Sequence, residues 1–335
     1  MIKKIAKKAT KILAMLVVVV IILALGIIVA EPLLYNDFYS RDSQKEFETP
    51  GANDGLVQQG FCYAGDNVML ASGYMGKKNP SRIYVVKGTS FDNRTTTYVQ
   101  LKDEKGKYTT SHMSGVAAFK DKVYVCDSEM SPAVVLVYSL DEILSANNGD
   151  DVVAKQSIKV HSNSSFCHVE NGILYVGEFF MDGKYSTDDS HKTTTPSGDK
   201  NNAMVFGYLL NSDGDLCSGT PVCALSITDK IQGMTFAGDK IVLSSSYGIA
   251  ASQLYVYDVQ KANNQPKGSV VVDGETIPLV YLDSNSLVET ISAPPMSEEV
   301  VYLNGRLYVM NESASNKYLF GKLLRAKYIW SIKID

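Results

Sequence analysis

A pattern near the middle of the chain, residues Lys230–Asp258, recurs along most of the chain's length. It consists of two apolar runs joined by a tight Gly-Asp-Lys turn, then a short polar loop and a third apolar run that ends in tyrosines. Further copies, spaced roughly 50–70 residues apart, begin at Gln58, Met113, Asn163 and Met296. Five copies at this spacing predict a repeat architecture in which each copy is one structural unit.

Four short apolar runs per copy are typical of the blades of a β-propeller. The five copies therefore predict an all-β fold of five four-stranded blades, with a degenerate sixth blade as the open alternative. The last copy ends at Asp335 without a fourth strand, and a segment near Lys45–Thr49 could supply that strand and close the ring. Closure matters because an open sheet edge promotes aggregation. A β-sandwich is the second candidate fold, but it does not explain five copies of one motif.

The hairpin turns set the register of the copies. Counting back from each turn, the first strands are expected to begin at Gly60, Gly115, Ser165, Gly233 and Glu298. The fifth copy thus carries a carboxylate where the others carry a small residue, which the crowded centre of the ring favours. The turns should lie on one face of the disc, and the starts of first strands and the ends of second strands on the other. The second face also carries the long polar loop Phe179–Ala203, expected to be mobile and to carry binding residues.

The N-terminus predicts the location of the chain. Five lysines between Lys3 and Lys11 precede an uninterrupted apolar run, Ile12–Ala30. A helix of this length spans roughly 28 Å, close to the hydrocarbon core of a bilayer. We therefore expect a single-pass cell-membrane protein with a cytoplasmic basic tail (residues 1–11), an uncleaved signal anchor (12–30), a stalk (31–53) and a propeller ectodomain (54–335) outside the cytoplasm. A cleaved signal peptide is the alternative, although Ile28 is bulky for a position near a cleavage site.

Charge and cysteine content narrow the range of functions. The formal net charge is −4, so nothing predicts nucleic-acid binding. The five cysteines lack the spacing of a zinc site. Cys62, Cys126 and Cys167 fall within apolar strands and are interpreted as core residues. Cys217 and Cys223 flank a bend, and a disulfide between them remains open.

Oxygen-bearing side chains are expected at the mouth of the channel, on the face opposite the hairpin turns. One group comes from the start of a first strand and the rest follow second strands: Glu298, Asp127, Glu178, Asn311 and Glu312. Such a set suits a hard cation, and Ca²⁺ is the candidate cofactor. A solvated acidic rim with ordinary hydrogen bonds is the alternative. Because a buried carboxylate needs compensation, Glu298 should meet a cation, Arg82 or a proton.

Aromatic and polar side chains at the same mouth are the candidate ligand-binding residues. Tyr74 and Tyr247 occupy one position after the second strands of copies one and four, and Phe179 occupies it in copy three. His112 precedes the first strand of copy two, and Arg82 opens the third strand of copy one. Aromatic faces at a rim can stack on sugar rings or pack against a peptide. Packing between blades would explain them equally well.

The repeat form resembles that of known propellers. Three first strands open with the dipeptides Gln59-Gly60, Ser114-Gly115 and Gln232-Gly233. Together with the apolar-Tyr-Val second strands, they make residues 58–335 similar to extracytoplasmic bacterial propellers of the NHL and SMP-30/lactonase type. The chain contains no Gly-x-Ser-x-Gly elbow, Walker loop, dinucleotide fingerprint or His-Glu-x-x-His motif.

The resemblance to lactonase-type propellers implies a Ca²⁺ ion in the channel, for which Glu298, Asn311 and Asp127 would be the counterparts. Two functional hypotheses follow. The first is a binding or scaffolding module, held outside the cell membrane, that engages an envelope protein or glycan through its loop-rich face. The second is a calcium-dependent hydrolase of the lactonase or esterase class with an acidic site at the channel mouth.

Overall fold

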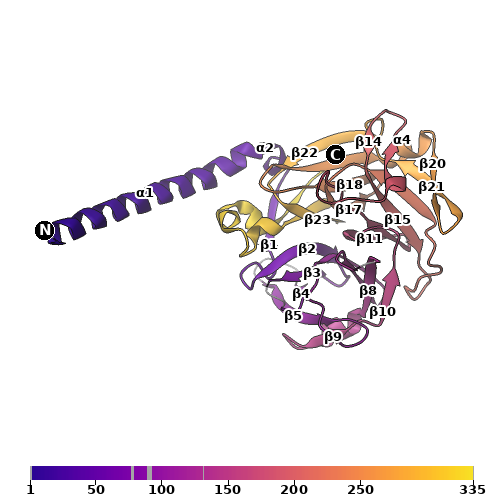
Figure 1. Cartoon of the computed structure of the whole chain (residues 1–335), viewed down its shortest axis with the longest axis horizontal. Helices are drawn as coiled ribbons and strands as arrows, with labels where there is room; N and C mark the ends of the chain where they lie inside the picture. Colours follow the sequence, from indigo (N-terminus) through magenta and orange to yellow (C-terminus); the bar gives the residue numbers. More distant parts are fainter. Residues whose placement is uncertain (1, 77–78, 89–92, 131, 335) are drawn as a thin grey trace.

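The computed structural model describes residues 2–76, 79–88, 93–130 and 132–334 of the 335-residue chain. A long helix, α1 (Ile2–Leu34), leads into a ring of β-sheets from which it projects sideways (Figure 1). The lysine side chains at positions 3, 4, 7 and 8, which the sequence assigns to a basic tail, lie outside the described residues.

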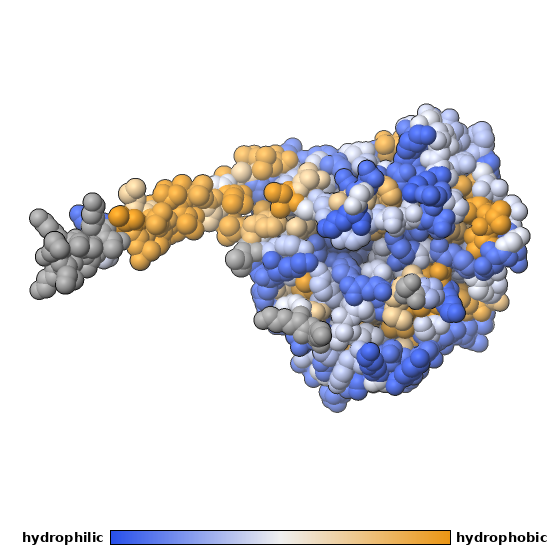
Figure 2. All heavy atoms as spheres, in the orientation of Figure 1, coloured by the Kyte–Doolittle hydropathy of each residue, from blue (hydrophilic) through white to orange (hydrophobic). Residues whose placement is uncertain are grey.

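The helix α1 is apolar enough to cross a membrane. Within Thr10–Leu34 the most apolar window of 18 residues has a mean hydropathy of 3.5, and none of it is buried within the protein. Figure 2 shows this apolar rod beside a propeller whose visible surface is mainly hydrophilic. Length and composition make α1 compatible with a single-pass membrane anchor, and a signal sequence would have the same properties.

Five four-stranded antiparallel blades form the ring, which confirms the predicted fold and blade number. Blade 1 contains β2 (Leu56–Tyr63), β3 (Val68–Met75), β4 (Arg82–Lys87) and β5 (Thr95–Lys102). Blade 2 contains β6 (Met113–Phe119), β7 (Lys122–Asp127), β8 (Val134–Ser139) and β10 (Gln156–Lys159). Blade 3 contains β11 (Phe166–Glu170), β12 (Ile173–Gly177), β15 (Ala203–Leu209) and β16 (Cys223–Ile227). Blade 4 contains β17 (Ile231–Ala237), β18 (Lys240–Ser245), β19 (Ser252–Asp258) and β22 (Leu287–Ala293).

Blade 5 closes the ring with a strand from the N-terminal side, as the sequence indicates. It contains β23 (Ser297–Leu303), β24 (Arg306–Asn311), β25 (Tyr328–Ile332) and β1 (Gln44–Glu48). The strand β1 pairs antiparallel with β25, from Gln44 opposite Ser331 to Glu48 opposite Tyr328. The five innermost strands contact one another in turn, and β23 returns to β2. The segment 31–53, expected as a stalk, therefore contributes β1 and the short helix α2 (Asn36–Tyr39) to the propeller.

The outer strand of blade 4 is the last of the strand-like runs that follow β19. The run Pro278–Asp283 reads as its fourth strand, but that run falls mainly in β21 (Glu275–Tyr281), which pairs parallel to β16 of blade 3. With β20 (Gly268–Val272), β21 forms a hairpin that widens blade 3. The weaker run that follows it, β22, completes blade 4 instead. Both runs are suited to strand formation, so pattern alone could not choose between them.

The registers of blades 3 and 5 are each one residue away from the predicted registers. Each hairpin places a residue of positive φ first in its turn, namely Lys120, Asn171, Gly238 and Asn304 in blades 2 to 5. The acid of the Gly238-Asp239 turn is therefore second, whereas Asn171 and Asn304 are first in their turns. Aligning Asp with Asn shifts blades 3 and 5 by one residue. The equivalents of Gly233 at the crowded axial position are Phe166, and not Ser165, in blade 3 and Glu299, and not Glu298, in blade 5. A Cβ atom on Gly233 would lie 2.7 Å from the Cα atom of Glu299.

The remaining segments are short helices and insertions. They are α3 (Leu140–Ser145), α4 (Val259–Asn264), η2 (Asp189–His191), η3 (Glu312–Ala314), η4 (Leu319–Leu323), η5 (Arg325–Lys327), β9 (Asp151–Val153), β13 (Thr193–Thr194) and β14 (Lys200–Asn201). The apolar core lies between adjacent blades, and Cys62, Cys126 and Cys167 are buried in it as expected. Cys217 and Cys223 both carry free thiols.

Candidate functional site

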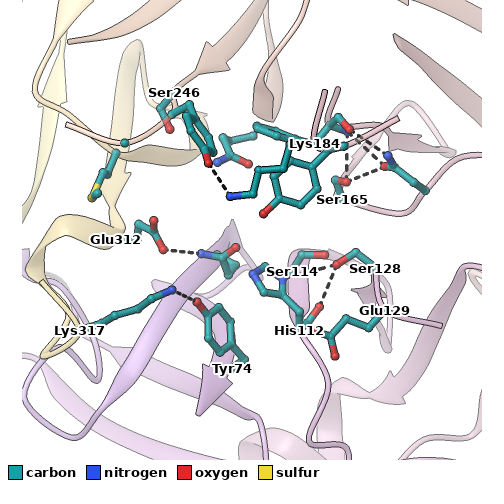
Figure 3. A pocket seen from close by; sticks show the side chains of 18 of the residues that line it. Tyr74, His112, Ser114, Ser128, Glu129, Ser165, Lys184, Ser246, Glu312 and Lys317 are labelled. Atoms are coloured by element: carbon teal, nitrogen blue, oxygen red, sulfur yellow. Dashed lines mark hydrogen bonds between the residues drawn. The ribbon is translucent and has the colours of Figure 1, made fainter. Parts of the chain in front are cut away.

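A pocket of about 700 Å³ opens at the mouth of the central channel, on the face opposite the hairpin turns. All five blades contribute to it through the starts of first strands and the segments after second strands (Figure 3). The lining residues are Gln59, Tyr74, His112, Ser114, Ser128, Glu129, Asn163, Ser165, Phe179, Lys184, Tyr185, Ser186, Gln232, Ser246, Tyr247, Gly248, Met296, Glu312, Lys317 and Tyr318. The pocket therefore combines aromatic rings with amides, hydroxyls, carboxylates and two ammonium groups.

β-Bulges aim part of this lining into the channel. The pairing of β2 with β3 skips Gln59, and the pairing of β17 with β18 skips Gln232. A bulge leaves a residue out of the ladder and reorients its side chain. Gln59 consequently donates from Nε2 to Oε2 of Glu312 across the boundary between blades 1 and 5 (3.0 Å). Gln232 reaches Oε1 of Glu298 in the same manner (3.4 Å).

Glu298 is buried beneath the lining. Its side chain is 2 % exposed, and Gln232 is its hydrogen-bonding partner within the described residues. Burial, together with repulsion from Glu312 and Glu299, raises the pKa of Glu298 well above its usual range. The raised pKa is consistent with a proton, one of the three partners that the sequence allows for this carboxyl group.

Two further carboxyl groups surround Glu298. Oε1 of Glu299 accepts hydrogen bonds from the backbone N–H groups of Met234 (2.9 Å) and Val300 (3.3 Å), whereas Oε2 has no partner in the described part of the protein. Burial raises the pKa of Glu299 as well. Glu312 accepts from Gln59 and from the hydroxyl of Tyr318 (3.1 Å), and burial raises its pKa. The floor of the pocket is therefore an acidic cluster in which burial favours protonated carboxyl groups.

Four of the predicted ligand-binding residues line the pocket: Tyr74, His112, Phe179 and Tyr247. The rings of Tyr74 and His112 pack with their centroids 4.3 Å apart. Burial lowers the pKa of His112, so its imidazole is neutral at pH 7. The fifth predicted residue, Arg82, lies outside the pocket. It donates to the hydroxyl of Tyr84 (3.2 Å) and packs over the ring of Tyr98.

The predicted metal ligands do not converge. Asp127 accepts from the hydroxyl of Ser111 (2.7 Å), and the side-chain amide of Asn311 donates to the carbonyl of Pro295 (3.1 Å). Only Glu312 of that set lines the pocket, with Glu298 beneath it. Nowhere among the described residues do three or more His, Cys, Asp or Glu side chains lie where they could hold a metal ion.

Glu178, the remaining predicted metal ligand, anchors the long loop instead. Its Oε1 atom lies 2.9 Å from Nδ1 of His191, and its Oε2 atom accepts from the backbone N–H of Met204 (3.0 Å). Both Glu178 and His191 are buried. The loop 179–203 also contains the small hairpin β13–β14. It is thus a folded insertion whose first part lines the pocket, whereas the sequence indicates a mobile segment.

Sequence reasoning missed two lysines that the structure brings into the pocket. Lys184 lies in the long loop and donates to the hydroxyl oxygen of Tyr247 (2.7 Å). Lys317 lies between η3 and η4 and donates to the hydroxyl oxygen of Tyr74 (2.5 Å). Figure 3 shows the two side chains extending into the pocket from opposite sides. A signal was present, because each lysine directly precedes a tyrosine on the loop-rich face.

Comparisons with known proteins place the chain in no family. No family model matches the chain, and no curated protein matches it. Among solved structures, glutaminyl cyclase from Myxococcus xanthus is similar with a TM-score of 0.40 and 11% identity, over 80% of this chain and 90% of the other. BamB from Moraxella catarrhalis is similar with a TM-score of 0.36 and 9% identity, over 83% and 86% of the two chains.

Proposed function

We propose that this protein is a membrane-anchored binding module that takes up an envelope ligand in the pocket at the mouth of its channel. One observation carries the proposal: all five blades direct side chains into a single cavity of about 700 Å³ on the loop-rich face. Its volume is within the range of small-molecule and cofactor sites in proteins, roughly 300–1,000 Å³. The opposite face carries the hairpin turns together with the connections that contain α3 and α4.

The location outside the cytoplasm is part of the proposal. The apolar helix α1 supports it by its length and hydropathy. The lysines that precede the apolar run favour a cytoplasmic N-terminus, since positive residues flanking a span remain inside. The propeller, with the repeat form of NHL and SMP-30/lactonase-type domains, would then project from the outer surface, where its pocket meets envelope material.

The composition of the pocket supports a compact ligand that is partly polar and partly flat. Rings of Tyr74, Phe179 and Tyr247 provide faces for stacking. Gln59 and Gln232 provide side-chain amides aimed by the bulges. These groups suit a sugar ring or a short peptide, the two ligand classes that the sequence indicates.

Filling the pocket with a bulky side chain tests the proposal. Ser186 is exposed and lines the pocket, so Ser186→Trp should block it without disturbing the core. Ser212→Trp is the matched control, because Ser212 is equally exposed but lies in a turn on the hairpin face. The full-length proteins, in lipid nanodiscs, are applied to arrays of envelope oligosaccharides and short peptides. We expect binding by the wild type and by Ser212→Trp and its loss in Ser186→Trp. Equal binding by all three proteins would place the site elsewhere and refute the proposal.

A further inference from the structure

We infer that the pocket selects an acidic sugar, that is, a sugar ring bearing a carboxylate or a phosphate, through two similarly built lysine–tyrosine caps. This inference rests on the proposed binding function and specifies its ligand. It depends on four tyrosines and two lysines that belong to four different segments of the mouth. The shared chemistry is an anionic group attached to a polar ring, and the test below separates a carboxylate from a phosphate source.

The two caps have the same construction on different blades. In the first, the ammonium of Lys184 lies 5.1 Å from the ring centroid of Tyr185 and 5.2 Å from that of Tyr247, and it donates to the hydroxyl of Tyr247. In the second, the ammonium of Lys317 lies 5.2 Å from the ring centroids of both Tyr318 and Tyr74, and it donates to the hydroxyl of Tyr74.

The two caps have the same construction but not the same register in the repeat. Tyr74 is near the end of the second strand of blade 1, and Tyr247 follows the second strand of blade 4, one position beyond the equivalent of Tyr74. Each lysine comes from a separate insertion that follows the second strand of another blade, Lys184 from blade 3 and Lys317 from blade 5. Two insertions of unrelated sequence therefore deliver the same charged group to the same kind of tyrosine.

Both ammonium groups are held at the pocket without an ion-pair partner. Neither lysine takes part in any ion pair formed by the described residues. Their acceptors are neutral phenol oxygens, and an ammonium has three N–H donors. A carboxylate or phosphate would replace a neutral acceptor with a charged one, and charge-assisted hydrogen bonds are roughly twice as strong as neutral ones. We therefore expect the ammonium groups of the caps to bind the anionic group of a ligand.

Glu312 interacts electrostatically with Lys317, which lowers the pKa of Glu312 against the effect of burial, but the two side chains are not close enough to form an ion pair. Although Glu312 lines the same pocket as Lys317, its two oxygens accept from Gln59 and from the hydroxyl of Tyr318. Those bonds hold the carboxyl group on the floor, beneath the cap. The anionic group of a ligand would therefore lie above the floor, between the two lysines.

The rest of the lining favours a sugar over a peptide. A sugar ring presents apolar C–H faces and a girdle of hydroxyls, each of which both donates and accepts a hydrogen bond. The tyrosine rings of the caps suit the faces, and the amides and carboxyl groups of Gln59, Gln232 and Glu312 suit the hydroxyls. A peptide would gain most from an open strand edge. The second strands that lead into the pocket are paired on both sides within their blades.

Three probes that share one sugar ring test this selectivity. N-acetylglucosamine is neutral, N-acetylmuramic acid adds a carboxylate, and N-acetylglucosamine 6-phosphate adds a phosphate. Dissociation constants are measured for the full-length protein in nanodiscs at about 0.05 M and 0.5 M salt. We expect at least one acidic sugar to bind about tenfold more tightly than the neutral one, as one charge-assisted hydrogen bond allows. The preference should decrease at high salt, because the lysines are exposed and screened.

Substitution of the two lysines tests whether the caps cause the preference for acidic over neutral sugars. Lys184→Met and Lys317→Met retain the length of the side chain and remove its charge, and each should reduce the preference severalfold. The double variant should bind the acidic and neutral sugars equally. Lys192→Met is the matched control: Lys192 also packs over an aromatic ring of the same loop, but it is paired with Asp189 (2.5 Å) and lies outside the pocket. It should keep the full preference.

The outcomes separate this inference from the proposed function. Equal affinity of the wild type for acidic and neutral sugars, or a preference that survives in the double variant, overturns the acidic-sugar inference while the binding function stands. Binding of peptides but of no sugar, with loss in Ser186→Trp, would also overturn the acidic-sugar inference while the binding function stands. A carboxylate-only or phosphate-only preference supports the inference and identifies the source of the anion. Sugar binding that is unaffected by Ser186→Trp would refute both proposals.

Discussion

The side chain of Glu31 accepts a hydrogen bond from the backbone N–H of Arg325, 294 residues further along the chain (2.5 Å). The same carboxylate accepts from the N–H of Ala326 and from the hydroxyl of Tyr39 (2.7 Å). Glu31 is 1 % exposed, although it directly follows the apolar run of α1. The junction between the helix and the propeller is therefore a buried polar contact rather than a free linker, and η5 of blade 5 is fixed beside it.

A truncation series should locate the boundary of the folded unit. Deletion of residues 1–30 leaves Glu31, α2 and β1 in place, so we expect a soluble protein with the thermal unfolding of the wild type. Deletion of residues 1–53 removes β1 and exposes the edge of β25. It also removes Phe38, which is 1 % exposed in the core between blades 4 and 5. We expect this second protein to aggregate or to unfold at a much lower temperature.

Circular dichroism and size-exclusion chromatography measure both truncated proteins. A stable, monomeric protein lacking residues 1–53 would contradict the role of β1 in closing the ring. An insoluble protein lacking only residues 1–30 would show that α1 itself belongs to the folded unit.

Substitution at the axis should be costly even for the smallest side chain. A Cβ atom on Gly233 would lie 2.7 Å from the Cα atom of Glu299, a backbone atom that cannot rotate away. We expect Gly233→Ala to lower the free energy of unfolding by about 2–4 kcal/mol through overpacking. Gly219→Ala is the matched control, because nothing lies within 4 Å of the corresponding Cβ position. Chemical denaturation measures both, and equal stabilities would contradict the axial position of Gly233.

The sequence predicted the architecture well because each repeat consists of short local patterns that can be recognised without the structure. Hairpin turns, apolar strands and the missing last strand determine five blades and their closure by β1. The axial residue of blade 5 is found by counting back from its turn. The result depends on whether the Asp or Asn of a turn is its first or its second residue. That choice follows from backbone torsion angles at residues such as Asn304 (φ 51°), which composition does not reveal.

The site was less predictable for a different reason. The ends of strands could be located from the repeat, and four of the aromatic and histidine candidates do lie in the pocket. Arg82 belongs to a third strand, and its neighbours within blade 1 hold it away from the channel. Lys184 and Lys317 come from insertions that do not follow the repeat. Only the folded path of those insertions brings the two lysines to the mouth.

The orientation of the protein can be tested with a native thiol. Of the five cysteines, Cys217 is exposed, Cys223 is half-buried and the other three are buried. If the propeller lies outside the membrane, a membrane-impermeant maleimide added to intact cells should label the full-length protein. Cys217→Ser should abolish most of that labelling. Labelling that requires permeabilised cells would place the propeller in the cytoplasm and contradict the proposed location.

The buried carboxyl group of Glu298 should destabilise the protein as pH rises. Its folded-state pKa is raised, chiefly by burial, so between its unfolded pKa of about 4.3 and the folded value the native state binds more protons than the unfolded state. The free energy of unfolding therefore decreases as pH rises through that window, and below it this contribution is fully retained.

Glu298→Gln keeps an oxygen to accept the hydrogen bond from Gln232 but cannot ionise. We expect the variant to melt at the same temperature as the wild type at pH 4 and on the order of 2 °C higher at pH 7. Glu104→Gln, in an exposed turn, is the control and should follow the wild type at both pH values. Differential scanning calorimetry measures the three proteins, and a Glu298→Gln variant less stable than the wild type at pH 7 would show that the carboxylate is compensated by a partner rather than by a proton.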